Sequence, residues 1–244
     1  MRRIEFFDEV GSTNDEARDR VRFGHGDVVV AERQTAGRGQ RGNRWDSAHG
    51  ENLTFSVVLT PDFLPVAEQF LLSEAVSLAL VDTLARYGIG ATVKWPNDIY
   101  VGGRKVAGIL IENDVMGSRM SRSIVGVGLN VNQSEFCASL PNPTSMALAA
   151  GRAFDRREVL SSFLESLRVR YETLNSGDFG RIEADYHACL YRFGQPARYI
   201  LPDGAAFTGT ILGVETSGAL CVRHHDDERV RKYFFKEIES AREL

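Results

Sequence analysis

The sequence is poor in cysteine and has no long apolar run. These two deficits argue against a disulfide-rich or zinc-binding protein and against a membrane-spanning one. Its 244 residues include three cysteines, Cys137, Cys189 and Cys221, which are widely spaced and odd in number. This pattern suits neither a disulfide framework nor a zinc site, and it predicts a reducing, cytoplasmic setting. The most apolar helical stretch, residues 70–84, is interrupted by serine and acidic side chains and is too polar to cross a bilayer. We therefore expect no membrane partner.

An excess of positive charge is missing as well. With 29 lysines and arginines against 33 aspartates and glutamates, the net charge is −4. The chain lacks the global basic field typical of nucleic-acid-binding proteins, so we expect no nucleic-acid partner. Basic side chains gather locally instead, because Arg33, Arg38, Arg41 and Arg44 fall within one loop. That loop is a candidate anion-binding site.

The same loop is rich in glycine. Residues 37–42 read Gly-Arg-Gly-Gln-Arg-Gly, which formally matches a dinucleotide-binding motif. The context excludes that fold, because the segment that follows is typical of a strand rather than a helix. The pattern instead predicts a strand–loop–strand element whose glycines let a ligand approach the backbone. Its arginines, including Arg38 with no evident structural partner, would bind phosphate or carboxylate. The alternative is a mobile, solvated basic loop.

Residues 94–98, which read Lys-Trp-Pro-Asn-Asp, end a predicted strand. Proline cannot donate a hydrogen bond to a sheet, so Pro96 stops the strand and presents Asn97 and Asp98 at its end. Lys105 begins the next strand after a Gly-Gly turn, and so can lie within reach of Asp98. The two form either an ordinary surface ion pair or a buried pair that places an ammonium group beside a reacting carboxylate.

Two further segments bear on the site. Residues 126–130, Gly-Val-Gly-Leu-Asn, place two glycines on a strand, which predicts that a ligand or a tightly packed helix covers that face. Residues 12–14, Ser-Thr-Asn, precede a helical pattern that extends to Gly24. Thr13 and Glu16 have the spacing of a capping box, and helix capping explains most of this segment.

The hydrophobic pattern predicts a larger mixed unit followed by a small β unit. Helices are expected from Pro65 to about Tyr87, from Asp155 to about Leu174 and over residues 182–191. The predicted strands of the larger unit cover residues 27–32, 53–59, 92–95, 105–112 and 124–132. After a boundary near Arg192, four short strands are expected at 197–200, 205–214, 219–223 and 230–235.

Taken together and in this order, these segments resemble the biotin protein ligases, closely from Gly11 to about Asn132 and by layout beyond. The resemblance implies an α+β fold, with a mixed sheet backed by helices as in class II aminoacyl-tRNA synthetases. It implies a catalytic domain of residues 1–192 and an SH3-like C-terminal β-barrel of residues 193–244. The catalytic region starts almost at Met1, so a monofunctional ligase without an N-terminal DNA-binding domain is expected. The family usually carries arginine where this chain has Gln40.

The activity implied by the resemblance is ATP-dependent. Biotin would be activated as biotinyl-5′-AMP with Mg²⁺ and ATP, and then transferred to a lysine of a biotin carboxyl carrier protein or domain of a biotin-dependent carboxylase. Family members are often homodimers. The second enzyme considered is a lipoate–protein ligase or octanoyltransferase of the same fold. The alternative that is not an enzyme is an adaptor protein whose loop binds an acidic partner.

The resemblance also implies roles for individual residues. Lys105, Asp98 and Arg38 would be catalytic, with Lys105 stabilising the oxygen between the acyl carbon and phosphorus. Asn97 or Asp98 could hold Mg²⁺, and Asp98 could instead orient Lys105 or accept a proton from the incoming lysine. Trp45 would stack near adenine. The full set expected to bind biotin or nucleotide is Ser12, Thr13, Asn14, Gln34, Gly37, Arg38, Gly39, Gln40, Arg41, Trp45, Lys94, Asn97, Lys105, Gly108, Gly128 and Asn130.

Overall fold

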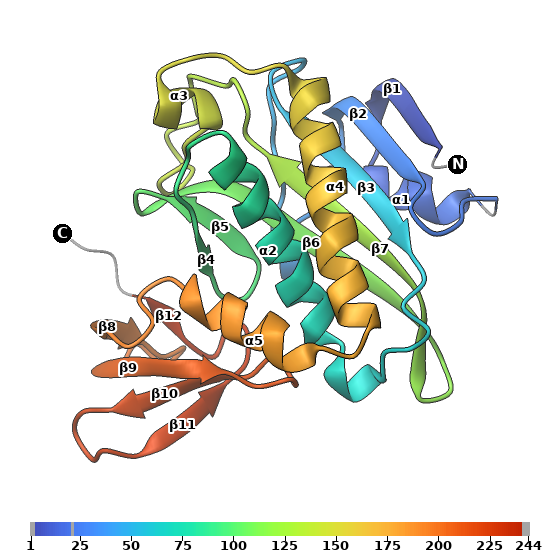
Figure 1. Cartoon of the computed structure of the whole chain (residues 1–244). Coiled ribbons are helices and arrows are strands. Elements are labelled where there is room, and N and C mark those ends of the chain that lie inside the picture. Colours follow the sequence, from blue (N-terminus) through green and yellow to red (C-terminus); the bar gives the residue numbers. More distant parts are fainter. Residues whose placement is uncertain (1–2, 21, 241–244) are drawn as a thin grey trace.

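A computed structural model describes residues 3–20 and 22–240, and it contains two β-sheets (Figure 1). The first is mixed and has the strand order β1-β2-β3-β7-β6-β5-β4. Its first two strands are parallel and the remaining neighbours are antiparallel. The strands are β1 (Ile4–Val10), β2 (Val28–Gln34), β3 (Leu53–Leu59), β4 (Thr92–Lys94), β5 (Asp98–Val101), β6 (Arg104–Met116) and β7 (Arg119–Leu129). The expected mixed sheet is confirmed.

Helices cover the two faces of this sheet unequally. Two long helices, α2 (Phe70–Arg86) and α4 (Arg156–Asn175), lie over one face, and the short α1 (Thr13–Asp19) packs on the other (Figure 1). Strand alternation separates the two sides, since Phe55 belongs to the main core under the long helices while Val58 packs with Ala17 of α1. The fold also includes α3 (Met146–Ala150), α5 (Phe179–Ala188) and two 3-10 turns, Gln40–Gly42 and Val66–Glu68.

Three local expectations are corrected. The helix expected from Pro65 begins as the Val66–Glu68 turn, and the α-helix starts only at Phe70. Helix α1 ends at Asp19 instead of reaching Gly24, and its N-cap, Ser12, makes no side-chain capping hydrogen bond. The sequence pattern also did not reveal β1. It is an edge strand whose side chains are mostly exposed, so it lacks the apolar alternation of a half-buried strand.

The second sheet is antiparallel and has five strands, in the order β11-β10-β9-β8-β12. Its strands are β8 (Pro196–Ile200), β9 (Ala206–Val214), β10 (Leu220–His224), β11 (Val230–Tyr233) and β12 (Glu239–Ser240). The four predicted strands are confirmed, and the two-residue β12 was too short to leave a pattern. The division of the chain after Arg192 stays a prediction; Arg192 itself has a positive φ of 60° at the turn before β8.

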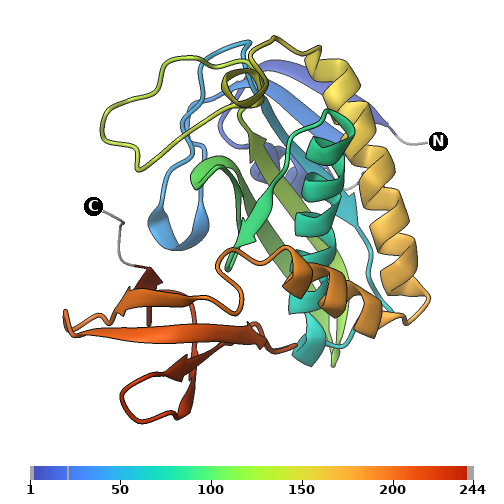
Figure 2. The same ribbon diagram turned by 60° about the vertical axis from the view of Figure 1, so that its left-hand side comes forward.

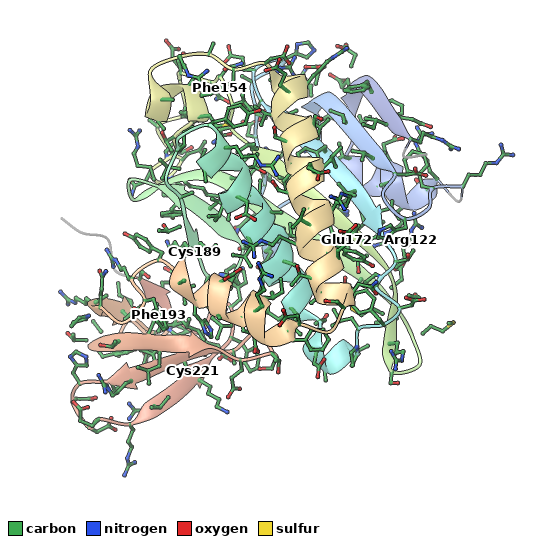
Figure 3. All side chains as sticks on the ribbon, in the orientation of Figure 1. Arg122, Phe154, Glu172, Cys189, Phe193 and Cys221 are labelled. Carbon is green, nitrogen blue, oxygen red and sulfur yellow. The ribbon has the colours of Figure 1, made fainter. Side chains whose placement is uncertain are left out.

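The two sheets meet at the turn after β4. Trp95 Nε1 donates a hydrogen bond to the carbonyl oxygen of Gly218 at 3.0 Å. A side chain at Gly218 would collide with Phe70, because its Cβ would lie 2.8 Å from the ring. Nearby, His187 accepts a hydrogen bond from Val214 and its ring stacks on Phe193, which Figure 3 labels at this junction. The tryptophan of the 94–98 segment is thus a contact between the two sheets.

Replacing Trp95 with phenylalanine is expected to lower the free energy of unfolding by about 1 kcal/mol, the usual net value of one hydrogen bond. The six-membered ring is kept, whereas the pyrrole part of the indole is lost and the Gly218 carbonyl loses its donor. Urea unfolding followed by circular dichroism would measure the change. An unfolding midpoint equal to that of the parent would show that this bond does not stabilise the junction.

Within residues 3–20 and 22–240, no helix is both long and apolar enough to span a membrane.

Candidate active site

Strand register places four of the predicted site residues in one row across the sheet. Lys94 pairs with Asp98, Asp98 with Gly108, and Gly108 with Gly128. Residues paired in adjacent antiparallel strands point to the same face. Gly128 lies four residues along β7 from Ile124, which packs under α1, so the row occupies the face away from α2 and α4. In Figure 2 the glycine loop, in light blue, lies on this side of the sheet.

Trp45, from the end of the glycine loop, covers the two glycines of this row. A Cβ built on Gly128 would lie 2.2 Å from the indole, and one on Gly108 would lie 3.2 Å from it. Only glycine at 128 therefore admits the ring at this depth. The prediction that something packs on the 126–130 segment is confirmed at both glycines: Trp45 covers Gly128, and Asn14 of helix α1 covers Gly126, where a built Cβ would lie 2.3 Å from its amide oxygen. The indole Nε1 is buried and finds no hydrogen-bond partner among the described residues.

Lys105 and Asp98 form a short ion pair beside this ring. Lys105 Nζ lies 2.6 Å from Asp98 Oδ1, with side chains 31% and 22% exposed, and 5.7 Å from the centre of the Trp45 ring. The pair is thus partly buried, between the two alternatives that the sequence left open. The backbone of Lys105 is held by residues 142–144, which exchange hydrogen bonds with it at 2.7 and 2.8 Å. Partial removal from water strengthens the field of the ammonium group at this point.

A polar cluster lies on the same face at the start of α1. Gln34 Oε1 accepts hydrogen bonds from the backbone nitrogen and the hydroxyl of Thr13, at 2.8 and 3.1 Å. Ser56 Oγ lies 2.8 Å from Thr13 Oγ1 and 2.6 Å from Asn14 Oδ1. Helix capping as the main role of residues 12–14 is therefore wrong, because these side chains turn toward the sheet. Ser56 was missed, and its only signal was that it is one of two hydroxyl residues, with Thr54, within the otherwise apolar strand β3.

The glycine loop folds as a closed element rather than a loose one. Residues 38 and 44 form an isolated bridge, and Gly39 donates to the carbonyl of Asn43 at 2.7 Å. Arg38 Nη2 contacts Asp15 Oδ1 at 2.6 Å and Glu112 Oε2 at 3.2 Å, so the expectation that this arginine has no structural partner is wrong. Two hollows of about 280 and 400 Å³ open beside the loop. They are lined by residues 33–39 and 42–46, including Gly37, Arg38, Arg44 and Trp45.

Three other predicted ligand-binding residues are engaged within the protein. Asn97 Nδ2 donates to the Ile109 carbonyl at 2.7 Å, and the buried Asn130 donates to the Thr144 carbonyl at 2.9 Å. Lys94 Nζ lies 3.1 Å from the hydroxyl of Tyr100, and burial raises the pKa of that phenol to about 12. Ser12 is buried beside the cluster, Gln40 begins the 3-10 turn, and the side chain of Arg41 lies outside the described part. Their ligand contacts stay predictions.

Comparison with known proteins places this site in a family. The biotin/lipoate A/B protein ligase family matches residues 7–130. The bifunctional ligase/repressor BirA of Bacillus subtilis is 33% identical over 218 residues, covering 88% of this chain and 66% of that protein. The biotin–[acetyl-CoA-carboxylase] ligase of Mycobacterium tuberculosis is 32% identical over 228 residues, covering 91% and 83%. The structure of biotin protein ligase from Aquifex aeolicus in complex with biotin and ATP superposes with a TM-score of 0.82, at 25% identity and full coverage of both chains.

Proposed function

Because this chain belongs to the biotin/lipoate A/B protein ligase family, we propose that the face built around Lys105 activates biotin with ATP and biotinylates a carrier protein. Relatives that share most of their length with this chain carry the name biotin–[acetyl-CoA-carboxylase] ligase. The observation that carries the proposal is the Lys105–Asp98 pair, which is 2.6 Å long and lies beside Gly108 and Gly128, two paired glycines that the Trp45 ring covers. A cation is fixed there next to a part of the sheet that has no side chains of its own.

The reaction has two steps. A carboxylate oxygen of biotin attacks the α-phosphorus of ATP, which forms biotinyl-5′-AMP and releases pyrophosphate. The amine of a carrier lysine then attacks the acyl carbon, and AMP leaves. Both steps require charge neutralisation and alignment rather than a covalent enzyme nucleophile, which suits a site made of cations and hydrogen-bonding groups.

The chain's own groups divide this work. Thr13 and Gln34 bind the polar ring of biotin, and Ser56 fixes Thr13 from below. Lys105 stabilises the bridging oxygen on which negative charge develops. The glycine loop closes over the carboxylate and phosphate through Arg38, and its glycines admit the ligand close to the backbone. The indole of Trp45, whose Nε1 has no hydrogen-bond partner among the described residues, lies against adenine.

Magnesium fits this site as an ion brought by the nucleotide. The described residues hold no group of three or more acidic, histidine or cysteine side chains able to cage a metal. Mg²⁺ commonly binds one or two protein oxygens together with substrate phosphates. Asp98 has a second carboxylate oxygen beside the one paired with Lys105, and Asn97 adjoins it, so these two residues would hold the ion. When bound, it neutralises phosphate charge.

Replacing Arg38 with alanine is expected to speed the release of biotinyl-5′-AMP by roughly 10- to 100-fold, which corresponds to the loss of one charge-assisted hydrogen bond of about 1.5–3 kcal/mol. The Arg38 side chain is 44% exposed and those of its partners Asp15 and Glu112 are 52% and 28% exposed, so the loss of this partly solvated pair should leave the fold intact. Release from the purified variant would be followed by filtration of the labelled intermediate. A release rate equal to the parent's would remove Arg38 from this role.

Carrier acylation tests the proposed function and its alternatives. The chain would be incubated with ATP, Mg²⁺, a biotin carboxyl carrier domain and either biotin, lipoate or octanoate, and the carrier would be weighed by mass spectrometry. A mass increase with biotin alone is expected. An increase with lipoate or octanoate would favour the second enzyme, and no increase with any acid would favour an adaptor. A cytoplasmic setting and a homodimer belong to the same proposal, and sedimentation with biotin and ATP would measure the dimer.

A further inference from the structure

We infer that Glu112 is a positioning residue whose carboxylate joins the two walls of the site, the start of α1 and the glycine loop. No sequence motif singled it out, because it lies at the far end of the apolar run of β6. It points to the same face as the row of site residues, since it is four residues along β6 from Gly108. Its two oxygens face one polar group from each wall.

The contacts of Glu112 define this link. Its Oε2 accepts a hydrogen bond from Asn14 Nδ2 at 2.8 Å. Its Oε1 and Oε2 lie 3.3 and 3.2 Å from Arg38 Nη2, which also contacts Asp15 at 2.6 Å. The Glu112 side chain is 28% exposed against 52% for Asp15. Solvent screens an exposed ion pair more strongly than a partly buried one. Glu112 therefore contributes more to holding Arg38, relative to Asp15, than the longer Glu112–Arg38 distance alone would suggest.

Asn14 gives Glu112 a rigid anchor. The amide nitrogen of Asn14 reaches Glu112 and the Leu110 carbonyl, while its oxygen lies 2.6 Å from Ser56 Oγ. Asn14 is 3% exposed, and a Cβ at Gly126 would come within 2.3 Å of its oxygen. Its amide is therefore fixed by bonds on both ends and by close packing. A carboxylate bonded to such a group cannot drift, so Arg38 is held at a set distance from Thr13 and Gln34.

This arrangement orders the loop before any ligand arrives. A loop that is already held in one position loses less conformational entropy when a ligand binds, which raises affinity without a new ligand contact. Arg38 is balanced by two carboxylates, which an anionic ligand would have to replace in part. The effect on ligand affinity rests on the proposed ligase function, whereas the ordering of the loop does not.

Limited trypsin digestion of the full chain tests the ordering. Glu112→Gln keeps an oxygen that can accept from Asn14 but removes the charge that holds Arg38. Cleavage after the exposed Arg44, mapped by mass spectrometry, is expected to be about 5- to 10-fold faster than in the parent, as for the loss of one modest interaction. Asp114→Asn is the matched control, because Asp114 lies two residues along the same strand face and pairs with Arg18 of α1 at 2.8 Å. Its cleavage rate should stay within about 2-fold of the parent's.

A second variant and a kinetic measurement distinguish the positioning role of Glu112 from a general loss of stability. Arg38→Gln removes the other partner of the same link, so it should raise cleavage after Arg44 to a similar extent, and the double variant should add little. In biotin adenylation, Glu112→Gln should raise the KM for biotin about 10-fold while kcat stays within about 3-fold. The melting temperatures of Glu112→Gln and Asp114→Asn should match.

The possible results separate cleanly. Parental cleavage in Glu112→Gln, or equal sensitivity in Asp114→Asn, would overturn the inference. A fall in kcat at unchanged KM would also overturn it, because a positioning role for the binding loop predicts the opposite split. If the parent protein fails to adenylate biotin, the proposed ligase function fails, and the digestion rates still decide whether Glu112 holds the loop.

Discussion

Replacing Lys105 with methionine is expected to slow biotin adenylation by at least about 100-fold, as for the loss of an oxyanion-type donor. The two side chains are similar in length, so packing beside Trp45 changes little while the charge disappears. Negative charge on the bridging oxygen grows toward the transition state, and Lys105 therefore stabilises that state more than the bound substrates. Its neighbour Asp98, 2.6 Å away, holds the ammonium in place before the substrates bind.

Rapid-quench measurement of biotinyl-5′-AMP formation would give this rate. Arg104→Met is the matched control, because it removes the adjacent cation from an exposed position at the start of the same strand. Its adenylation rate should stay within about 3-fold of the parent's. Biotin binding should weaken in Lys105→Met and thermal stability should change little. A Lys105→Met protein that forms the intermediate at a near-parental rate would contradict the assignment and make Lys94 the better candidate.

The second large effect concerns stability and pH at Glu74. This side chain lies on α2, is 1% exposed, and its Oε2 has no hydrogen-bond partner among the described residues. Burial, with a smaller contribution from Glu183, raises its pKa from 4.5 to about 8. The folded protein therefore keeps a proton that the unfolded chain loses above about pH 4.5. Stability should fall as the pH rises from about 4.5 to about 8 and then level off, with an upper limit of about 5 kcal/mol.

Glu74→Gln removes this titration while keeping the shape of the side chain. Relative to the parent, the variant should gain several kcal/mol of unfolding free energy between pH 5 and pH 8.5. Glu158→Gln, at an exposed position of α4, should show no such gain. Urea unfolding at a series of pH values would measure both differences. A Glu74→Gln difference that stays constant over this range would show that the carboxyl group is already ionised, or already hydrated, in the folded protein.

The parts of the site that the sequence predicted depend on short-range geometry. Asp98 and Lys105 flank one hairpin, so their approach follows from a turn of two glycines, and the structure brings them to 2.6 Å. The paired glycines of β7 likewise implied a covering group before the identity of that group was known. In the fold, the alternation in β3 and the glycine and proline boundaries of the second unit led to the observed strands.

The missed parts depend on contacts between distant segments. Glu112 meets Asn14 across 98 residues and Arg38 across 74, and nothing near Glu112 in the sequence marks either approach. Trp95 donates to a carbonyl 123 residues away. Thr13 and Asn14 fit a helix cap locally, but bonds to Gln34 and Ser56 replaced that role. Local sequence motifs therefore predicted where the site lies. The contacts of each side chain within the site depend on segments that are far apart in the sequence.

Biotin-dependent exchange of labelled pyrophosphate into ATP tests the central claim most directly. The exchange requires a reversible attack of a carboxylate on the α-phosphorus and needs no carrier protein, so it isolates the activation step. With Mg²⁺ present, we expect exchange with biotin, none without an added acid, and a loss of at least about 100-fold in Lys105→Met. Exchange supported by lipoate but not by biotin, or no exchange with any acid at saturating ATP, would contradict the assignment of this face as a biotin-activating site.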